Sequence, residues 1–254
     1  VIFFDNKSND QSKNIFLFFK QKKFKYFYSS KKLNLYKARN RAIKLCVGDL
    51  ISFLDVDDWW EKNKLKAQVK VMKNKKIDIV YSNYYLFKEM YNTKKIFFKS
   101  ILPSGNIFED LIDNYNIGIL TVMIKKKIFE KKSNFFDNKF NIMGDYDLFI
   151  RLAQNYKFKY LERPLATYRA HNSNYSKLNY KSEIKEFKYW TTKKFVIKNI
   201  RKETIQNLKL DYLPLKAKKY LDENKLKLFY KHYNKISFFK IKIKLLVNLI
   251  LKKL

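Results

Sequence analysis

The first 80 residues alternate between short apolar segments and longer segments whose apolar residues fall on one helical face, and this pattern limits the possible folds most strongly. Apolar runs predict four strands, at Val1–Phe4, Lys25–Tyr28, Leu50–Leu54 and Ile77–Ser82. The segments between them predict three helices, from Ser12 to about Lys23, from Asn34 to Val47 with Gly48 as C-terminal cap, and from Trp60 to Lys73. Strands that alternate with helices indicate an α/β fold, here a mostly parallel sheet flanked by helices.

The pattern changes further along the chain. Residues 84–170 predict a hairpin of Tyr84–Phe87 and Ile96–Lys99, helices at Asn106–Asp113 and Asp145–Gln154, and strands at Leu120–Ile124, Lys157–Leu161 and Leu165–Arg169. Lysine-rich helices follow after about Tyr180. We therefore expect an α/β domain over residues 1–178 and a helical C-terminal extension over residues 179–254. The tail Ile236–Leu254 suits a helix in a membrane interface and, equally, a packed last helix or a frayed end.

Composition limits the chemistry. Hydrophobic residues make up 46% of the 254 residues, which excludes a disordered chain. The single cysteine, Cys46, excludes a disulfide framework, and the two histidines, His171 and His232, exclude a His-rich zinc site. A catalytic metal would therefore sit on oxygen ligands, which favours Mg²⁺ or Mn²⁺.

The formal net charge of +33 has two explanations. The lysines are spread along the whole chain, together with many Asn, Ile, Phe and Tyr residues. That mixture is typical of compositional bias, combined here with contact to an anionic membrane surface. Specific nucleic-acid binding is the alternative, but it predicts basic residues gathered on one helix or arm. We favour the membrane surface and expect no specific nucleic-acid partner.

An acidic run follows the predicted strand Leu50–Leu54. Asp55, Asp57 and Asp58 place three carboxylates in four positions at a strand end, where they repel one another. A divalent cation relieves this repulsion, and a diphosphate completes its coordination sphere. The alternative is a solvated turn in which Asp58 caps the next helix. The run predicts a metal and diphosphate site, because the tryptophans at 59 and 60 disfavour a plain solvated turn.

Four other positions have side chains suited to such a site. Arg39 suits a phosphate contact, although an exposed arginine on a helix is ordinary. Asp5, at the end of the first strand, suits a base or ribose, but polar loops of this kind are common. Asp145 opens a helix and suits a catalytic base, or simply favours the helix dipole. His171 is a candidate metal ligand or phosphate contact, or an ordinary surface histidine.

The order and spacing of these segments resemble the family 2 glycosyltransferases, which have the GT-A fold. The resemblance covers about residues 1–176. Its most specific part is Ala38-Arg39-Asn40, then Gly48-Asp49-Leu50-Ile51-Ser52-Phe53-Leu54-Asp55-Val56-Asp57-Asp58-Trp59-Trp60, then Lys64-Leu65 and Gln68. The resemblance implies a metal-dependent enzyme that transfers a sugar, with inversion, from a nucleotide donor to an acceptor hydroxyl.

The resemblance also implies a role for each candidate. Asp5 would contact the nucleoside, Arg39 the nucleotide side of the donor and Asp55 the donor itself. Asp57 would be a metal ligand, and His171 matches a position that helps some members bind metal or diphosphate. Asp145 would be the base that deprotonates the acceptor.

Two departures from the family pattern stand out. The family usually has glutamate directly before the catalytic aspartate, where this chain has Gly144. Relatives also begin with a further strand and nucleotide-binding loop before the position of Val1. We therefore expect residues upstream, and hypothesise that this chain is a fragment that does not turn over alone.

The expected partners are a nucleotide sugar, with UDP as the favoured nucleotide, and a glycan or lipid-linked acceptor. The basic sequence and the family resemblance favour synthesis of a cell-surface polysaccharide or lipid-linked glycan at the inner, cytoplasmic face of the membrane. A truncated, inactive relative that acts as a binding module is the competing hypothesis.

Overall fold

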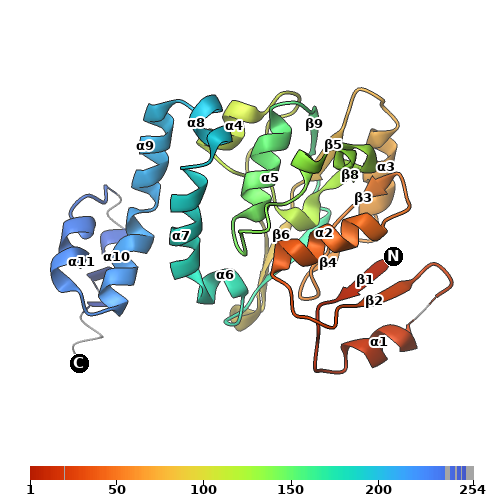
Figure 1. Ribbon diagram of the computed structural model, residues 1–254, viewed down its shortest axis with the longest axis horizontal. Helices are drawn as coiled ribbons and strands as arrows, with labels where there is room; N and C mark the ends of the chain where they lie inside the picture. Colours follow the sequence, from red (N-terminus) through yellow and green to blue (C-terminus); the bar gives the residue numbers. More distant parts are fainter. Residues whose placement is uncertain (20, 238–240, 244, 247, 250–254) are drawn as a thin grey trace. The chain divides into compact units, whose positions relative to one another are not determined.

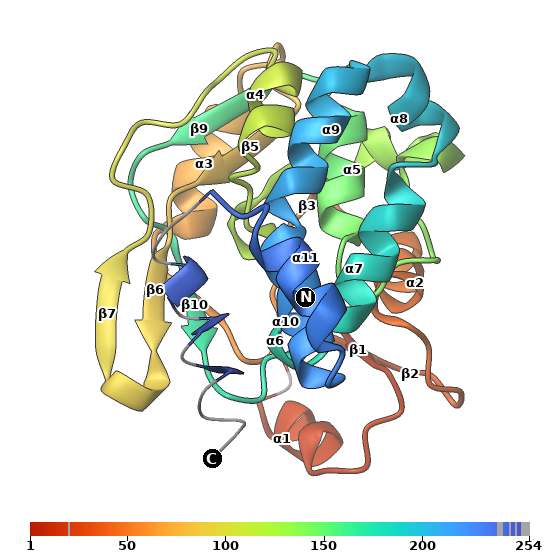
Figure 2. The same ribbon diagram turned by 90° about the vertical axis from the view of Figure 1, so that its left-hand side faces the viewer.

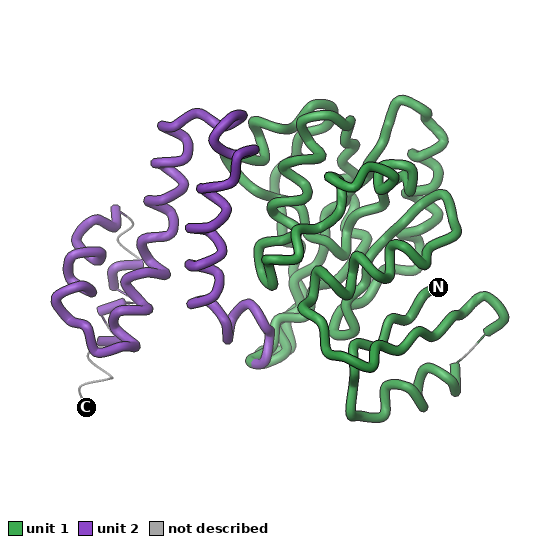
Figure 3. The backbone as a smooth tube through the Cα atoms, viewed as in Figure 1, with its two compact units in different colours: residues 1–172 green, residues 173–254 purple. Residues whose placement is uncertain are grey.

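The computed structural model describes residues 1–19, 21–237, 241–243, 245–246 and 248–249. The backbone divides into two compact units, Val1–Asn172 and Ser173–Leu254 (Figure 3). The division falls a few residues before the predicted boundary, and the assignment of residues 1–178 and 179–254 as domains stays a prediction.

The first unit contains both strands and helices (Figure 1). Its strands are β1 (Ile2–Asp5), β2 (Lys25–Tyr28), β3 (Leu50–Ile51), β4 (Trp59–Trp60), β5 (Ile79–Ser82), β6 (Tyr85–Lys88), β7 (Thr93–Ile96), β8 (Met123–Lys125), β9 (Phe158–Leu161) and β10 (Ala166–Ala170). Its α-helices are α1 (Ser12–Phe18), α2 (Leu35–Leu45), α3 (Lys64–Met72), α4 (Phe108–Asp113) and α5 (Gly144–Ala153). Short 3₁₀ helices occur at Glu89–Tyr91, Ile119–Thr121, Lys126–Glu130 and Lys132–Asn134.

The α/β architecture is confirmed, but the sheets are mixed and not mostly parallel. The described strands form a pair β1-β2 and two four-stranded sheets, ordered β3-β8-β5-β9 and β4-β10-β6-β7. β1 with β2, β5 with β9 and β6 with β10 are parallel, whereas β8 and β7 pair antiparallel with their neighbours. The regular strand–helix alternation ends at β5. Among the later strands, β7 follows a hairpin turn and β8 follows a 3₁₀ turn, and neither connection imposes a parallel crossover.

The core of the first unit lies around β5 and α5. Ile79, Val80 and Tyr81 of β5 are fully buried, and so are Leu148 and Phe149 of α5. α3 packs against β5, and α4 packs against α5 (Figure 1). The apolar face predicted for the helix at residues 145–154 therefore points into this core. Helix α3 differs, because it buries Lys64, Gln68 and Met72.

Helix α2 is fixed at its start by a side-chain cap and along one face by packing. The Asn34 side chain caps its N-terminus by accepting a hydrogen bond from the Lys37 N–H at 2.8 Å. The helix buries one face and packs against β1 (Figure 1). Its predicted end was wrong. The helix stops at Leu45 because the backbone is already extended at Cys46, so Gly48 is not its cap.

Two other boundaries differ from the prediction. Trp59 and Trp60 do not start a helix but form β4, which pairs antiparallel with β10, and α3 begins only at Lys64. The strand predicted from Leu120 starts at Met123, because the preceding residues form a 3₁₀ turn. In both places an apolar run was compatible with more than one local structure, and tertiary pairing decided between them.

Other elements agree with the prediction in kind but not in length. The hairpin of β6 and β7 turns at residues 89–92, where Asn92 adopts a left-handed conformation (Figure 2). Helix α1 begins at Ser12, as predicted, and ends at Phe18. Lys20, within the predicted continuation of that helix, lies outside the described residues.

The described part of the second unit is helical, as predicted. Its helices are α6 (Tyr175–Leu178), α7 (Tyr180–Trp190), α8 (Lys194–Asn199), α9 (Lys202–Asp211), α10 (Leu213–Asp222) and α11 (Leu226–Tyr233). Leu221 and Phe229 form a buried cluster with Ile236, Leu245 and Leu249, which favours packing over exposure for these tail residues. Residues 238–240, 244, 247 and 250–254 of the tail lie outside the described residues. No described helix combines the length and apolarity needed to cross a membrane.

Candidate active site

The acidic run forms a tight turn between β3 and β4. The Asp58 N–H donates to the Asp55 carbonyl at 3.1 Å, and Val56 at the tip is 89% exposed. Asp58 does not cap a helix, because its Oδ1 accepts the N–H of Arg169 on β10 at 2.9 Å. The turn is therefore fixed by a sheet partner, which leaves Asp55 and Asp57 to make separate contacts.

Arg39 of α2 binds the first aspartate of this turn. Its Nη2 lies 2.7 Å from both carboxylate oxygens of Asp55. The Arg39 side chain is 10% exposed and the Asp55 side chain 41%, so the arginine fixes a carboxylate that still faces solvent. The guanidinium also lies 5.4 Å from the ring centre of Tyr36, one turn earlier on the same helix.

Asp57 faces His171, which directly follows β10. The His171 Nε2 lies 3.1 Å from Asp57 Oδ2, and the two side chains are 14% and 33% exposed respectively. These residues are 114 positions apart in sequence, so their pairing depends on the contact between the acidic turn and the end of β10. Two metal-binding candidates therefore lie together.

The three aspartates create strong local negative charge. Burial, together with the charges of Asp57 and Asp55, raises the pKa of Asp58 to about 7, although the Arg169 N–H opposes this rise. The repulsion expected from the sequence is thus present in the folded chain. Arg39 neutralises part of this charge at Asp55.

Asp145 lies in the first turn of α5. Its Oδ1 accepts hydrogen bonds from the Tyr146 N–H at 2.9 Å and from the Tyr36 hydroxyl at 3.2 Å. Burial raises the pKa of Asp145, and the charge of Arg39 with these hydrogen bonds offsets part of the rise. The Tyr146 and Tyr36 donors both lie at Oδ1, which leaves Oδ2 as the candidate oxygen for taking a proton.

Asp5, at the end of β1, has a different environment. The carboxylate is buried and accepts hydrogen bonds from the Ser8 N–H and the Tyr26 hydroxyl, one at each oxygen. Burial alone would raise its pKa, but these hydrogen bonds hold the pKa of Asp5 below its ordinary value. Both oxygens thus stabilise the loop after β1. A nucleoside contact by Asp5 stays a prediction.

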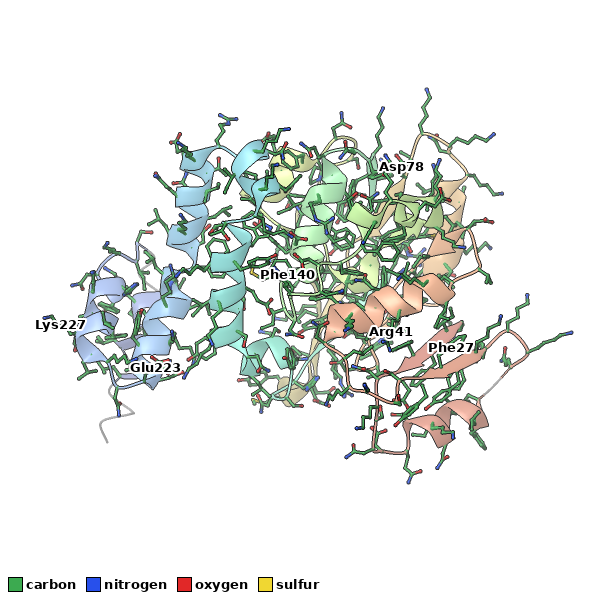
Figure 4. All side chains as sticks on the ribbon, viewed as in Figure 1. Phe27, Arg41, Asp78, Phe140, Glu223 and Lys227 are labelled. Carbon is green, nitrogen blue, oxygen red and sulfur yellow. The ribbon has the colours of Figure 1, made fainter. Side chains whose placement is uncertain are left out.

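The other charged residues near these candidates have structural contacts. Asp147 is fully buried and its Oδ2 lies 2.9 Å from Arg151 one turn later, so this second acid of α5 is paired within the helix. Arg41, labelled in Figure 4, extends from α2, and its Nη1 lies 3.4 Å from the Ser29 hydroxyl after β2. Both side chains therefore stabilise parts of the fold outside the acidic turn.

The structure thus connects five of the six predicted site residues. Arg39 binds Asp55, and Asp57 faces His171 from the same acidic turn. Asp145 joins them through Tyr36, which shares α2 with Arg39. Asp5 makes none of these contacts, although its neighbour Asn6 exchanges two 2.9 Å hydrogen bonds with Leu33 just before α2.

Sequence reasoning missed two residues that support this cluster and one buried lysine in the core near it. Tyr36 contacts the candidate base, and Asn40 fixes the loop before α5 through hydrogen bonds to Phe136. Lys64 is fully buried, with its Nζ 2.7 Å from Gln68 Oε1. Asn40 and Lys64 lie in the central run that resembles the family, so there was a sequence-based reason to expect a role for them. For Tyr36, the only such indication was the unusual glycine at position 144.

The geometry allows a test of whether the residues fit a divalent cation. In the described residues, no group of three or more His, Cys, Asp or Glu side chains is placed to hold a metal. Asp57 and His171 nevertheless offer an oxygen and a nitrogen that face each other. Mg²⁺ and related cations often take only one or two protein ligands and complete their shell with water and phosphate oxygens. The pair fits a cation shared with a diphosphate.

Comparison with known proteins identifies the family. The sequence model of glycosyl transferase family 2 matches residues 1–133, more than half of the chain. The chain belongs to this family. The resemblance carried by the central run, from Ala38 to Gln68, is thereby confirmed.

Two curated family relatives have known biosynthetic roles. WfgD of Escherichia coli, a UDP-Glc:α-D-GlcNAc-diphosphoundecaprenol β-1,3-glucosyltransferase, is 30% identical over 151 residues, which cover 59% of this chain and 56% of WfgD. AmsB of Erwinia amylovora, an amylovoran biosynthesis glycosyltransferase, is 31% identical over 179 residues, which cover 66% of this chain and 59% of AmsB. The chain thus spans somewhat more than half the length of these relatives.

Solved structures show the same fold. TarS 1–349 from S. aureus in complex with UDP aligns with a TM-score of 0.56 at 16% identity, covering 85% of this chain and 69% of that one. The complex with UDP-GlcNAc aligns with a TM-score of 0.55 at 13% identity, covering 92% and 80%. At these identities the likeness concerns the fold alone, and it confirms the predicted GT-A-like class.

Proposed function

We propose that this family 2 chain contains the donor site and the base of an inverting glycosyltransferase. The observation that carries the proposal is the joining of Asp55 to Arg39 and of Asp57 to His171 within one turn. This arrangement holds two carboxylates at defined positions beside basic or metal-binding partners. It suits a donor diphosphate better than it suits a purely structural turn, because Asp55 and Asp57 both remain partly exposed.

We propose Mn²⁺ or Mg²⁺ as the cation, with Asp57 and His171 as its protein ligands. Such a cation would stabilise negative charge on the departing diphosphate. Asp55, held by Arg39, would orient the donor beside it. The likeness to TarS complexes with UDP and UDP-GlcNAc supports UDP as the nucleotide.

Asp145 is proposed as the base. Its Oδ2 would remove the proton from the acceptor hydroxyl while that oxygen forms a bond to the anomeric carbon and the bond from this carbon to the diphosphate oxygen breaks. The proton ends on Asp145, and the nucleoside diphosphate leaves with the bonding electrons. Attack from the side opposite the leaving group inverts the anomeric configuration. The raised pKa of Asp145 suits this step, because a base works best when its pKa lies near the working pH.

The acceptor and place of action follow from the relatives and from charge. WfgD acts on a sugar linked to diphosphoundecaprenol, which supports a lipid-linked acceptor in cell-surface polysaccharide synthesis. The net charge of +33 supports attraction to an anionic membrane at its cytoplasmic face. Contact with an anionic membrane surface gives the basic residues a role that requires no nucleic-acid partner.

Calorimetry of the whole chain tests the donor site. We expect UDP to bind the wild type in the presence of Mn²⁺, and we expect Asp57→Ala to weaken this binding at least about tenfold, because one ligand of the cation is lost. Asp49→Ala is the matched control, since this exposed aspartate lies just before β3, and it should bind UDP as the wild type does.

Two outcomes would contradict the proposal. Equal UDP affinity in the wild type and in Asp57→Ala would show that Asp57 takes no part in binding the donor. Absence of UDP binding in the wild type would show that this chain has no donor site of the proposed kind. Intact UDP binding in Asp145→Asn is expected, since that residue acts on the acceptor.

A further inference from the structure

Gly144 lies against an aromatic ring. A Cβ atom built on this glycine would lie 2.4, 2.5 and 2.6 Å from three ring atoms of Tyr36, closer than real side chains approach one another. In this chain the Tyr36 ring occupies the space that any side chain at position 144 would need. The glycine and the tyrosine therefore form a matched pair.

The Tyr36 side chain is held firmly. It is only 2% exposed, and its ring stacks on Phe136 with 5.1 Å between ring centres. Its hydroxyl lies 2.8 Å from the carbonyl oxygen of Ile142, in the loop before α5. A ring fixed at both its face and its hydroxyl has little rotational freedom, so it can hold a neighbouring group in position.

The same hydroxyl reaches the candidate base. It lies 3.2 Å from Asp145 Oδ1, so its single proton has two acceptors, the carboxylate and the Ile142 carbonyl. When Asp145 is ionised, the hydroxyl can donate to it. When Asp145 carries a proton on Oδ2, the hydroxyl can still donate to Oδ1 or to the Ile142 carbonyl. The contact therefore suits both protonation states.

We propose that Tyr36 is a positioning residue for Asp145 and that Gly144 admits its ring, so that a tyrosine from α2 orients the acid at the start of α5. This inference rests on the proposed function for the role of Asp145 as a base. The arrangement ties the base to α2, the same helix whose Arg39 holds Asp55. One helix thus sets the positions of both the acceptor side and the donor side of the site.

Other groups also act on Asp145. Arg39 of α2 favours its ionised form by charge, and the Tyr146 N–H donates to it. Tyr115, which follows α4, is close enough to be influenced by the Asp145 charge, but its buried hydroxyl has no hydrogen-bond partner among the described residues. Tyr115→Phe is therefore a matched control, because it removes a buried phenol hydroxyl from the same neighbourhood without removing a hydrogen bond.

Carboxyl titration by ¹³C NMR tests the proposal without requiring turnover. Asp145→Asn assigns the signal in the whole chain. In Tyr36→Phe the ring and its packing remain but the donor is lost, so the Asp145 midpoint should shift to higher pH. Tyr115→Phe should leave it in place. An unchanged midpoint in Tyr36→Phe, or an equal shift in both variants, would overturn the proposal.

A double-mutant cycle tests the pairing of Gly144 with Tyr36. Gly144→Ala should lower the thermal unfolding midpoint by several degrees, because the new methyl group overlaps the ring. In a Tyr36→Ala background the same change should cost much less. Additive losses would show that the two residues are not a matched pair.

The two proposals fail in different ways. If the wild type binds UDP with Mn²⁺ and Asp145 titrates alike in wild type and Tyr36→Phe, only the role of Tyr36 is wrong. If the wild type binds no UDP, the donor site is wrong, whatever the titration gives. In any transfer reaction, Tyr36→Phe should lower kcat about tenfold with little change in the KM for the donor.

Discussion

At the residue scale, each aspartate of the acidic turn has a different partner. Arg39 holds Asp55, His171 faces Asp57, and the backbone of β10 holds Asp58. The sequence could predict the run, because three carboxylates in four positions are conspicuous. It could not predict these partners, which come from α2 and from β10. Contacts between residues so distant in sequence depend on tertiary packing, which a local sequence pattern does not predict.

Lys64 shows the same limit. It belongs to the central run that resembles the family, yet its side chain is buried. Its Nζ lies 4.3 Å from the ring centre of Trp60 and donates a hydrogen bond to Gln68 Oε1. Gln68 in turn donates to the Thr121 carbonyl at 2.6 Å. These residues of the family run therefore support the core near the site and do not contact the acidic carboxylates.

This burial predicts a pH-dependent stability. Burial lowers the pKa of Lys64 from its ordinary value of 10.5 to about 7, so the unfolded chain binds more protons between these limits. The free energy of unfolding should therefore rise with pH from about 7 to 10, by at most about 1.4 kcal/mol per unit from this group. Urea unfolding at several pH values measures the slope.

Lys64→Met should reduce that slope, because the titrating group is gone. Lys66→Met, at an exposed position of the same helix, should leave the slope as in the wild type. Parallel stability profiles for the wild type and Lys64→Met would contradict a lowered pKa of Lys64 in the folded chain.

At the scale of elements, α2 organises the site. It contacts β1, the acidic turn and the loop before α5 through residues one or two turns apart. Asn40, buried on this helix, donates at 2.8 Å to the Phe136 carbonyl and accepts from the Phe136 N–H at 3.0 Å. A helix and a loop about 100 residues apart in sequence are therefore fixed together by one amide side chain.

Replacement of that amide should loosen the loop. Asn40→Ala should lower the free energy of unfolding by about 2–4 kcal/mol, because a buried N–H and carbonyl of Phe136 lose their partners. Lys37→Ala, on the exposed face of the same helix, should cost less than about 0.5 kcal/mol. Chemical denaturation measures both, and similar losses for the two variants would rule out this role of Asn40.

The predicted elements differ in how well local sequence determines them. Lys25–Tyr28 was predicted with its observed bounds, since three consecutive aromatic residues favour a strand. The helix predicted from Trp60 was wrong at its start, because Trp59 and Trp60 pair with β10, more than 100 residues away. The mixed direction of the sheets was missed for the same reason. Strand direction depends on connections that periodicity does not encode.

At the scale of the whole molecule, positive charge is the dominant feature. The net charge of +33 is distributed along the chain and accompanies a site rich in aspartate. A strongly basic protein is attracted to any polyanion, including anionic lipids and nucleic acids. Charge alone therefore does not identify the partner, and an anionic membrane surface remains our proposal.

Vesicle binding tests this choice. The chain should sediment with phosphatidylglycerol-containing vesicles at about 50 mM salt, remain free with phosphatidylcholine vesicles, and be released at about 500 mM salt, because the attraction is electrostatic. Asp57→Ala should bind these vesicles as the wild type does. Tighter binding to duplex DNA than to anionic vesicles at the same salt would favour the nucleic-acid alternative.

We propose that a cation and a donor diphosphate bind where Asp57 faces His171. Crystals of the whole chain grown with UDP and Mn²⁺ test it most directly, through anomalous scattering from the metal. We expect a single strong anomalous peak within coordination distance of Asp57 and His171, with the UDP phosphates beside the metal on the side away from these two residues. A Mn²⁺ peak remote from both side chains, or UDP bound elsewhere on the chain, would contradict it.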